Sequence, residues 1–362
     1  MRILLIQQEF LDVQSMKMSN YAGNIGIVDV LIAGGAQVDV IYVPHFQSMH
    51  RKIDWKQYNV CIINELVHSL TTTTANRINE SNLKEIRRHG VRLGALIGES
   101  LSSYVDPKGE LFDFAKNRNK IIQQHLDYFD FFIPHCTQDI KNKKRILLDK
   151  PCFWWSPWSN NAFDLDVPLQ KKSLLLGFNG SIYQSRYEYL LSEQVNVDQV
   201  IVHDEDAAYW HPLLSLIKHD EKITSLSFAE YQKMIVAPVR ARRFQAEQAL
   251  IRALSRYRYL LQLPAYFNGA HTRVIQIIQA SAVCLTPAFP WSADQLCFAD
   301  GVDCVYYNPK VKGDLIAKLK WIDANPSVYE RIVLQAKQRN FSMRSAAAAG
   351  FGYLSFINFL IN

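Results

Sequence analysis

The sequence predicts an α/β protein with two tandem Rossmann-like domains that face a cleft. Its 362 residues, 49% hydrophobic and 20% charged, are typical of a globular chain with about two domains of roughly 150 residues each. Short runs of Val, Ile and Leu without polar alternation are typical of strands buried on both faces of a parallel sheet. These runs alternate with longer segments of helical pattern, as in doubly wound α/β domains.

The first half of the chain contains five predicted strands with predicted helices between them. The strands are expected at 3–6, 38–43, 60–63, 92–97 and 131–134. The helices are expected near 24–34, 75–89, 116–126 and 137–147. A segment with several prolines and tryptophans, 151–168, then interrupts the alternation and predicts an interdomain connection that packs its aromatic side chains.

After this connection the alternation resumes. Strands are expected at 173–178, 200–203, 257–263, 282–286 and 303–307. Helices are expected near 185–194, from Pro238 to about 255, and near 272–281, 313–324, 327–340 and 345–361. We therefore predict an N-terminal domain over 1–165, a C-terminal domain over 166–345, and a final helix over 346–362. One possible position for this helix is against the N-terminal domain.

Composition excludes several classes of protein. The chain is too apolar for intrinsic disorder, and its six scattered cysteines lack the CxxC pairs of a structural zinc site. No run reaches the 18 or so apolar residues of a transmembrane helix, and the first residues lack the pattern of a signal peptide. We expect a cytoplasmic protein with reduced thiols, no metal and no transmembrane segment. A net charge of +6 is compatible with an anionic ligand but does not require one.

Ligands of open α/β sheets bind beyond the carboxyl ends of the strands, so the loops that follow strands are the candidate sites. The strongest signal is the loop 268–273, which contains Gly269, His271, Thr272 and Arg273. Gly269 permits a tight turn, Thr272 is a good helix N-cap, and Arg273 lies in the first helical turn. A cation beside free backbone N–H groups is suited to a phosphate. The alternative is a surface arginine paired with a carboxylate.

A second loop, 177–186, follows the predicted strand at 173–178 and contains Asn179, Gly180 and Arg186. Glycines at a strand end allow the backbone to approach a ligand, and Arg186 opens the next helix. The loop is not a GxGxxG motif, so an ordinary strand-to-helix turn is an equally good interpretation.

The first domain offers candidates for the second substrate and for acid–base chemistry. The loop after the first strand ends at 20–26 with Tyr21, Gly23 and Asn24, and its length favours a functional role on the acceptor side. Glu99 and His135 each follow a strand and are candidates for a general base. A helix cap or a hydrogen-bonded histidine is the simpler alternative for each.

Two charged stretches have simpler explanations than ligand binding. The acidic residues at 204–206 follow a predicted strand and are typical of a solvated loop, although carboxylates can also hold a metal. Six arginines and one glutamate lie between 238 and 260, which accounts for +5 of the net charge of +6. This basic stretch is compatible with nucleic acid or an anionic membrane, but we favour a solvated helix face with one or two phosphate contacts.

From Tyr257 onward the order of features resembles the donor domain of GT-B glycosyltransferases, in particular the group-1 set that includes the CgeB type. The matching features are the strand YRYLLQL, Arg273 to Gln276 opening an apolar helix, a strand at 282–287, and the segment 298–307 with Asp303. The stretch GFNGSIYQSRYEYL is similar to the start of the same domain, and GESLSSY and FDFFIPHCTQDI are similar to the acceptor-side domain. A weaker likeness exists to CAP10-like glycosyltransferases.

The resemblance implies a metal-independent enzyme that moves a sugar from a nucleoside-diphosphate sugar to a carbohydrate or other small acceptor. Nucleic acid is a less favoured partner. It implies that Arg186 and Arg273 compensate the charge of the diphosphate, and that the turns around Asn179 and Gly269 donate backbone N–H groups. No bound cofactor is expected besides the sugar nucleotide.

The chain departs from the family pattern at three positions. Gln276 stands where many relatives have a glutamate on the donor ribose, Ser281 where they have glycine, and Asp303 where they have glutamate near the sugar. The neutral Gln276 motivates one alternative, a non-catalytic module that binds sugar nucleotides or glycans. The basic stretch motivates another, a transferase acting on nucleic acid. The sequence does not identify the sugar, the base, the acceptor, the stereochemistry, the general base or the oligomeric state.

Overall fold

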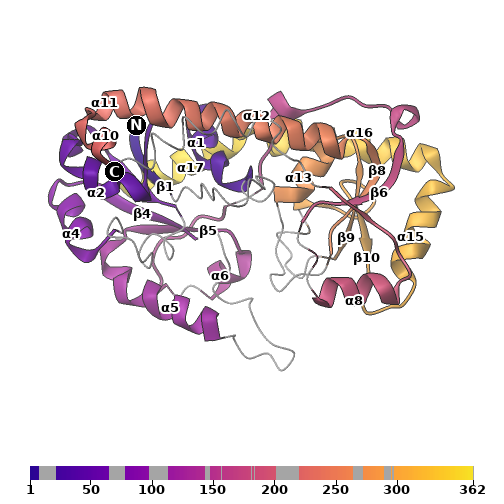
Figure 1. Ribbon diagram of the computed structural model, residues 1–362. Coiled ribbons are helices and arrows are strands. Elements are labelled where there is room, and N and C mark those ends of the chain that lie inside the picture. Colours follow the sequence, from indigo (N-terminus) through magenta and orange to yellow (C-terminus); the bar gives the residue numbers. More distant parts are fainter. Residues whose placement is uncertain are drawn as a thin grey trace.

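The computed structural model describes residues 1–7, 22–64, 78–97, 113–142, 147–155, 157–180, 182, 184–200, 220–263, 272–288, 295 and 297–361. It contains two α/β domains, each built on a five-stranded parallel sheet (Figure 1). The strand order is β2-β1-β3-β4-β5 in the first sheet and β10-β9-β8-β6-β7 in the second. Within the described part of the chain, both sheets have helices on their faces, as the apolar runs predict.

The elements of the first domain follow the predicted order. Its strands are β1 (Arg2–Gln7), β2 (Gln37–Tyr42), β3 (Val60–Ile63), β4 (Arg92–Ile97) and β5 (Phe131–Pro134). Its helices are α1 (Ala22–Ala33), α2 (Phe46–Met49), α4 (Glu80–Arg88), α5 (Asp113–His125) and α6 (Thr137–Lys141). Short 3₁₀ turns lie at Val43–His45, His50–Lys52, Trp55–Gln57 and Leu126–Tyr128.

The second half of the chain contains the other five strands and the longest helices. The strands are β6 (Leu174–Phe178), β7 (Asp198–Gln199), β8 (Tyr257–Leu261), β9 (Val283–Pro287) and β10 (Val305–Tyr307). The helices are α8 (Gln184–Ser192), α10 (Asp220–Ser225), α11 (Phe228–Tyr231), α12 (Ala237–Leu254), α13 (Thr272–Gln279), α15 (Asp314–Asp323), α16 (Pro326–Met343) and α17 (Ala346–Ile361). Two 3₁₀ turns, Asn161–Phe163 and Leu169–Lys171, lie in the interdomain connection.

Some predicted bounds differ from the structure. Helix α6 ends at Lys141 rather than near 147, and β10 begins at Val305 because the two preceding residues close a turn in which Asp303 accepts a hydrogen bond from the backbone of Ala299. The strand predicted at 200–203 is replaced by the two-residue β7, and residues 201–203 lie outside the described part of the chain.

The helix predicted to begin at Pro238 begins much earlier. Residues 228–254 form one continuous helix, in which the π-helical turn η8 (Gln232–Val236) joins α11 to α12. A proline inside an α-helix lacks an N–H and clashes with the carbonyl four residues earlier. The wider turn that precedes Pro238 relieves this clash, so the helix continues through the proline.

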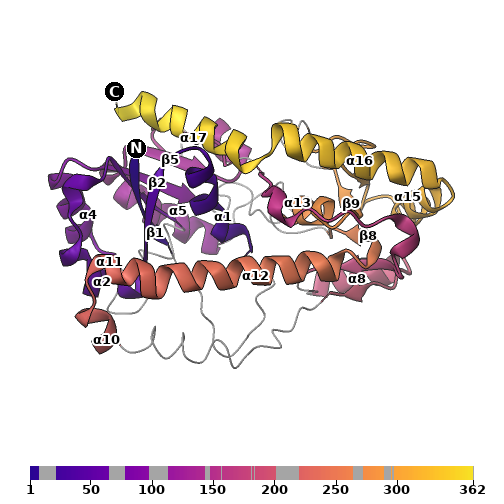
Figure 2. The same ribbon diagram turned by 90° about the horizontal axis from the view of Figure 1, so that it is seen from above.

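This continuous helix joins the two domains (Figure 2). Its leading end packs into the core of the first domain through Tyr231, Ile235 and Val239. Its trailing end packs into a core of the second domain through residues that include Leu250 and Leu254. A segment from the second half of the sequence therefore contributes to the core of the first domain.

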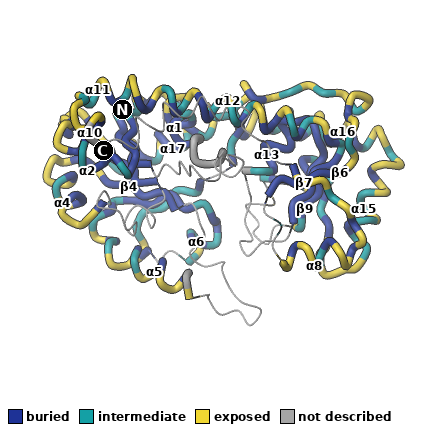
Figure 3. Tube along the Cα trace, viewed as in Figure 1, coloured by how far each residue is buried: buried dark blue, intermediate teal, exposed yellow. Residues whose placement is uncertain are grey.

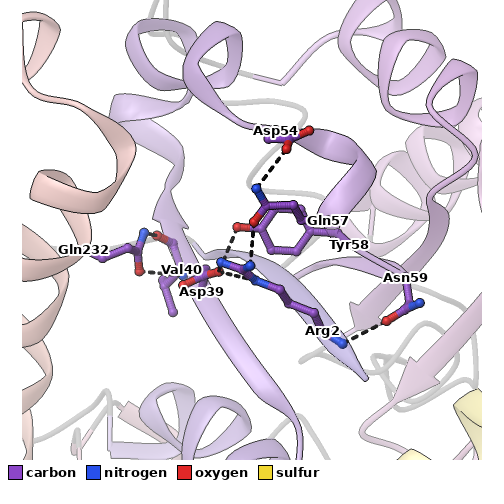
Figure 4. Close-up of polar contacts among 8 residues, drawn as sticks. All are labelled: Arg2, Asp39, Val40, Asp54, Gln57, Tyr58, Asn59 and Gln232. Atoms are coloured by element: carbon purple, nitrogen blue, oxygen red, sulfur yellow. Dashed lines mark hydrogen bonds and ion pairs between the residues drawn. The ribbon is translucent and has the colours of Figure 1, made fainter.

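The leading end also covers the edge of the first sheet at β2 (Figure 4). The side-chain amide of Gln232 accepts a hydrogen bond from the Val40 backbone N–H at 3.1 Å and donates one to the Val40 carbonyl at 2.6 Å. The Tyr231 hydroxyl accepts a hydrogen bond from the Tyr42 N–H at 3.1 Å and lies 2.9 Å from Nδ1 of the buried His45. The outward backbone groups of an edge strand are thus satisfied by side chains of the helix.

A second set of contacts fixes the start of the same sheet. The Arg2 guanidinium donates to the Asp39 carboxylate at 2.9 and 3.1 Å, which joins β1 to β2 (Figure 4). The Tyr58 hydroxyl donates to the same carboxylate at 2.8 Å. These bonds supplement the parallel register in which Arg2 lies opposite Gln37.

The interdomain connection runs beside the segment that leads into α17. Ser159 and Ser345 form an isolated parallel bridge, in which the Ala346 N–H donates to the Ser159 carbonyl at 2.8 Å. Trp155 stacks on Tyr353 with ring centroids 5.2 Å apart, and Phe153 packs edge-on against Tyr353. The connection therefore packs its aromatic side chains, as its composition predicts.

Helix α17 packs against α1, so the end of the chain lies on the first domain (Figures 1 and 3). The two helices meet at Gly34 and Gly350. A Cβ atom on Gly350 would lie 2.0 Å from the carbonyl oxygen of Val30 and 2.7 Å from the backbone nitrogen of Gly34. Because no side chain fits between the two backbones, glycine is required at this crossing. No helix in the part of the chain that the structure describes is long and apolar enough to cross a membrane.

We predict that Gly350→Ala lowers the free energy of unfolding by about 2 kcal/mol or more, because the added methyl group forces the helices apart. Gly352→Ala is the matched control, since its Cβ would lie 3.4 Å from the Phe153 ring, an ordinary contact, and alanine favours the helix. Denaturant unfolding of both variants measures the difference. Equal stability of the two variants would contradict a close crossing at Gly350.

Candidate functional site

The candidate donor site lies at the carboxyl end of β6, where the strand ends with Phe178 and the chain turns through Asn179 and Gly180. Gly180 has a φ of +154°, and a Cβ there would lie 2.9 Å from Cζ of Phe178 and 3.2 Å from Nη1 of Arg273. The backbone of the turn therefore lies directly against the Arg273 guanidinium, and only glycine allows this approach. Asn179 is buried beside it.

Two arginines from different helices meet over one aromatic ring at this turn. The guanidinium carbon of Arg186, on α8, lies 5.5 Å from the centroid of the Phe178 ring. The guanidinium carbon of Arg273, on α13, lies 6.0 Å from the same centroid. The negative face of the ring attracts cations and orients them, so Phe178 serves as a platform for both charges.

The neighbouring groups locate these arginines at the carboxyl edge of the second sheet. The Tyr307 hydroxyl donates to the Gln262 carbonyl, just beyond β8, at 2.6 Å. Burial raises the pKa of Tyr307, and the positive charge of Arg186 acts against this shift. Burial likewise raises the pKa of Cys284 on β9, opposed by the charge of Arg273. The charges of both arginines therefore act on residues of the second sheet, Tyr307 on the edge strand β10 and Cys284 on β9.

The sequence predicted both arginines, Asn179 and Gly180, and the structure brings these four residues together. It did not predict Phe178. The signal that could have identified it is an aromatic residue between two small or polar residues at the end of a buried strand, where it faces the helices that follow. Thr272 begins α13, and nothing is described of its side chain. Gly269 and His271 lie outside the described residues.

Gln276 and Asp303 have partners within the protein that differ from those implied by the resemblance. The Gln276 amide is buried and donates to Oε1 of Glu247, on α12, at 2.8 Å. Asp303 is fully buried, and its carboxylate pairs with Arg344 and, at 3.3 Å, with Arg339. In this arrangement Asp303 anchors the segment that leads from α16 to α17.

Glu247 belongs to a buried polar group that sequence reasoning missed. Its Oε2 is buried without a hydrogen-bond partner among the described residues, and burial raises the pKa of Glu247 to about 7. Arg243 lies one turn earlier on the same face of α12, and burial lowers the pKa of its guanidinium to about 10. Both residues are on the buried side of α12.

The basic stretch between 238 and 260 is not one surface. Arg242 and Arg243 are buried, Arg240 pairs with Asp29 at 2.7 Å, and Arg258 pairs with Asp323 at 3.7 Å. The expectation of a solvated helix face is therefore wrong for Arg242 and Arg243, because both lie on the buried side of α12.

The candidates of the first domain are described only in part. His135 follows β5; its N–H donates to the Ile97 carbonyl at 2.9 Å, and its carbonyl accepts from Nε1 of Trp154 at 3.0 Å. Glu99 and Tyr21 lie outside the described residues, as does the acidic stretch 204–206. Gly23 and Asn24 lie in the first turns of α1, and nothing is described of the Asn24 side chain. Among the described residues, no three potential ligands gather as a metal site.

No family model matches the chain, and no curated protein matches its sequence. Solved structures do match it along nearly its whole length. Sucrose-phosphate synthase from Thermosynechococcus elongatus has a TM-score of 0.60 at 11% identity, with 99% of both chains covered. The chain has the GT-B fold. An α-glucosyltransferase in complex with UDP-glucose and DNA containing an abasic site has a TM-score of 0.58 at 9% identity, with 99% of both chains covered. HepE from Anabaena, in complex with UDP, has a TM-score of 0.56 at 10% identity over 99% of this chain and 100% of that one.

We predict a pH-dependent difference in stability between wild type and Glu247→Gln. Because the folded state raises the pKa of Glu247 from 4.5 to about 7, the wild type loses stability as pH rises through this window. The variant, which keeps an acceptor for Gln276, lacks this loss, worth up to about 3 kcal/mol. Denaturant unfolding at intervals from pH 4.5 to about pH 8 measures it. Parallel stability curves for the two proteins would contradict a buried Glu247 carboxyl.

Proposed function

We propose that this protein is a glycosyltransferase that transfers a sugar from a nucleoside-diphosphate sugar to an acceptor. The observation that carries the proposal is the convergence of Arg186 and Arg273 over Phe178, at the carboxyl end of β6. This is the edge of an α/β sheet at which ligands bind. Solved structures of the same fold hold UDP or UDP-glucose, which supports a nucleotide-sugar donor here.

The two arginines supply the charge that the reaction needs. When the bond between the sugar and the diphosphate breaks, negative charge develops on the leaving phosphate oxygen. Two guanidinium groups held in place over the Phe178 ring stabilise this charge without reorganising at the moment of reaction. Guanidinium groups also match the geometry of phosphate oxygens.

Backbone groups complete the proposed diphosphate site. The first N–H groups of α13 have no partner within the helix, and Arg273 lies in this first turn. The turn at Gly180 brings backbone against the Arg273 guanidinium. We propose that the diphosphate lies between this turn and the start of α13.

The acceptor and the general base belong to the first domain in this proposal. Glu99 and His135 remain the candidates for the base because both follow strands of the first sheet, and the residues around Tyr21 remain candidates for acceptor binding. A carbohydrate or other small acceptor is favoured over nucleic acid, since four arginines of the basic stretch are buried or paired within the protein. Six free cysteines fit a reducing compartment, and we propose the cytoplasm.

We predict that Arg273→Ala and Arg186→Ala each weaken binding of the preferred sugar nucleotide by about 1.5–3 kcal/mol, the value of a hydrogen bond to a charged group. A thermal-shift screen of UDP-, ADP- and GDP-sugars identifies the donor, and calorimetry then measures the affinities. Arg256→Ala is the matched control, because Arg256 is exposed at the opposite end of β8. Unchanged affinity in both arginine variants would remove the proposed diphosphate site.

We also predict that the purified protein slowly releases nucleoside diphosphate from its donor in the absence of acceptor, and that EDTA leaves this rate unchanged. The two arginines neutralise the leaving group in place of a metal ion. A coupled assay for the released nucleotide measures the rate, with the Arg273→Ala protein as the inactive reference. Donor binding without any turnover, with acceptor or without, would favour a non-catalytic module; loss of turnover in EDTA would show that a metal is needed.

A further inference from the structure

Three adjacent strands of the second sheet change from apolar to polar residues at the same level. Leu260 on β8 lies opposite Gly177 on β6 and opposite Cys284 on β9. Two residues further along each strand, the same register brings three buried polar residues into one row on one face of the sheet. This row, which we name the polar row, consists of Asn179, Gln262 and Thr286, whose exposed fractions are 3%, 2% and 1%.

Gln262, the middle residue of the polar row, keeps the strand geometry of β8. Its N–H donates to the Leu285 carbonyl at 2.7 Å, as the next bond of the ladder to β9. Leu261 and Leu263 pack in the core on one face of the sheet. Because side chains alternate between faces along a strand, Gln262 lies on the other face, together with Leu260. This is the face on which the apolar residues of α13 pack.

The side-chain amide of Gln262 is buried without a hydrogen-bond partner. Among the described residues, none accepts a hydrogen bond from its Nε2. Gln279 on α13 is equally buried, but its Nε2 donates to Oγ of Ser159 at 3.1 Å and to the Asn160 carbonyl at 2.8 Å. A buried amide that has lost its bonds to water and gained no others costs free energy, so such groups are rare. An acceptor atom of a ligand would remove this cost at Gln262.

The polar row begins beside the proposed diphosphate site. Asn179 is followed by Gly180, whose backbone lies against the Arg273 guanidinium. Arg273 is followed by Val274, which packs in the same core as Leu260. From Asn179 the row runs across β8 to β9, because β8 lies between β6 and β9 in the sheet. A group that is attached to a diphosphate at Gly180 and extends toward β9 therefore meets the polar row.

The chemistry of the polar row differs from that of the two arginines beside it. Guanidinium groups match the charge and geometry of phosphate oxygens. An uncharged amide both donates and accepts hydrogen bonds, as a hydroxyl group does. The Thr286 hydroxyl donates to the Pro287 carbonyl at 3.2 Å, which leaves its oxygen as an acceptor. The polar row thus matches the hydroxyl groups of a sugar ring better than it matches phosphate.

We propose that the Gln262 side chain binds a hydroxyl group of the donor, so that the polar row selects the sugar nucleotide. This inference rests on the proposed function and names a residue that determines its donor specificity. A nucleoside-diphosphate sugar has two hydroxylated rings, the transferred sugar and the ribose, which share this chemistry. A site that bonds a substrate hydroxyl rejects an analogue without it, because the buried amide then stays unpaired.

The test compares Gln262→Met with Gln279→Met, which removes an equally buried amide that is bonded within the protein. Calorimetry measures the affinity for the preferred UDP-, ADP- or GDP-sugar, and denaturant unfolding measures the stability without ligand. Gln262→Met should bind the sugar nucleotide about tenfold more weakly and should be as stable as wild type or more stable, because its Nε2 has no bond to lose. Gln279→Met should be less stable and bind as wild type does.

Donor analogues identify the hydroxyl group. The probes are the sugar nucleotide, its free nucleoside diphosphate, and forms of both that lack a single hydroxyl of either ring. One deoxy analogue should bind wild type about tenfold more weakly than its parent does, and Gln262→Met should bind that analogue and the parent equally. If Gln262→Met loses affinity only for the sugar nucleotide, Gln262 binds the transferred sugar. If it loses affinity equally for the free nucleoside diphosphate, Gln262 binds the ribose.

Unchanged affinity in Gln262→Met would overturn the proposal. So would a Gln262→Met protein that discriminates against each deoxy analogue as strongly as wild type does, since the variant lacks the amide. If Gln262→Met does not fold, Gln262→Leu repeats the measurements, and instability of both variants would show a structural role and overturn the proposal. A wild type that binds no sugar nucleotide would instead overturn the proposed function, and this inference with it.

Discussion

The two-sided hydrogen bond between the Gln232 side chain and the backbone of Val40 is the contact on which much of the arrangement depends. It satisfies the exposed edge of the first sheet and fixes one end of the helix from 228 to 254. The other end of that helix enters the core of the second domain. The helix, together with the bridge between Ser159 and Ser345, holds the two sheets at fixed positions relative to each other. A movement of one domain relative to the other must therefore either bend this helix or displace it.

The arginines of the chain divide into two groups with different roles. On α12, Arg242 and Arg243 lie on the buried side of the helix, and Arg240 pairs with Asp29. Arg186 and Arg273 belong to helices that begin at the carboxyl edge of the second sheet, and they share one aromatic ring. In our proposal, position at the carboxyl edge of the second sheet, rather than local density of charge in the sequence, selects the cations that bind the diphosphate.

Local patterns predicted most of the fold. Buried parallel strands are continuous apolar runs, and helices repeat their apolar residues about every 3.6 positions. Local patterns also indicated that Asn179, Gly180, Arg186 and Arg273 follow strand ends, and the structure brings these residues together. They could not predict pairings between residues distant in the sequence. Glu247 binds Gln276 across 29 residues, and Arg344 binds Asp303 across 41. Pro238 favours a helix start because proline is common in the first turn of a helix, whereas the π-helical turn before it allows the helix to continue through the proline.

That π-helical turn also determines the rotational phase of the helix. A π-helical turn is equivalent to one residue inserted into an α-helix, and one residue corresponds to about 100° of rotation. Tyr231, just before the turn, and Gln232, its first residue, face the edge of β2, and Glu247, beyond the turn, faces α13. Without the extra residue the two faces would be out of phase, and the helix could satisfy only one domain at a time. A single extra residue thus lets one helix present Gln232 to β2 and Glu247 to α13.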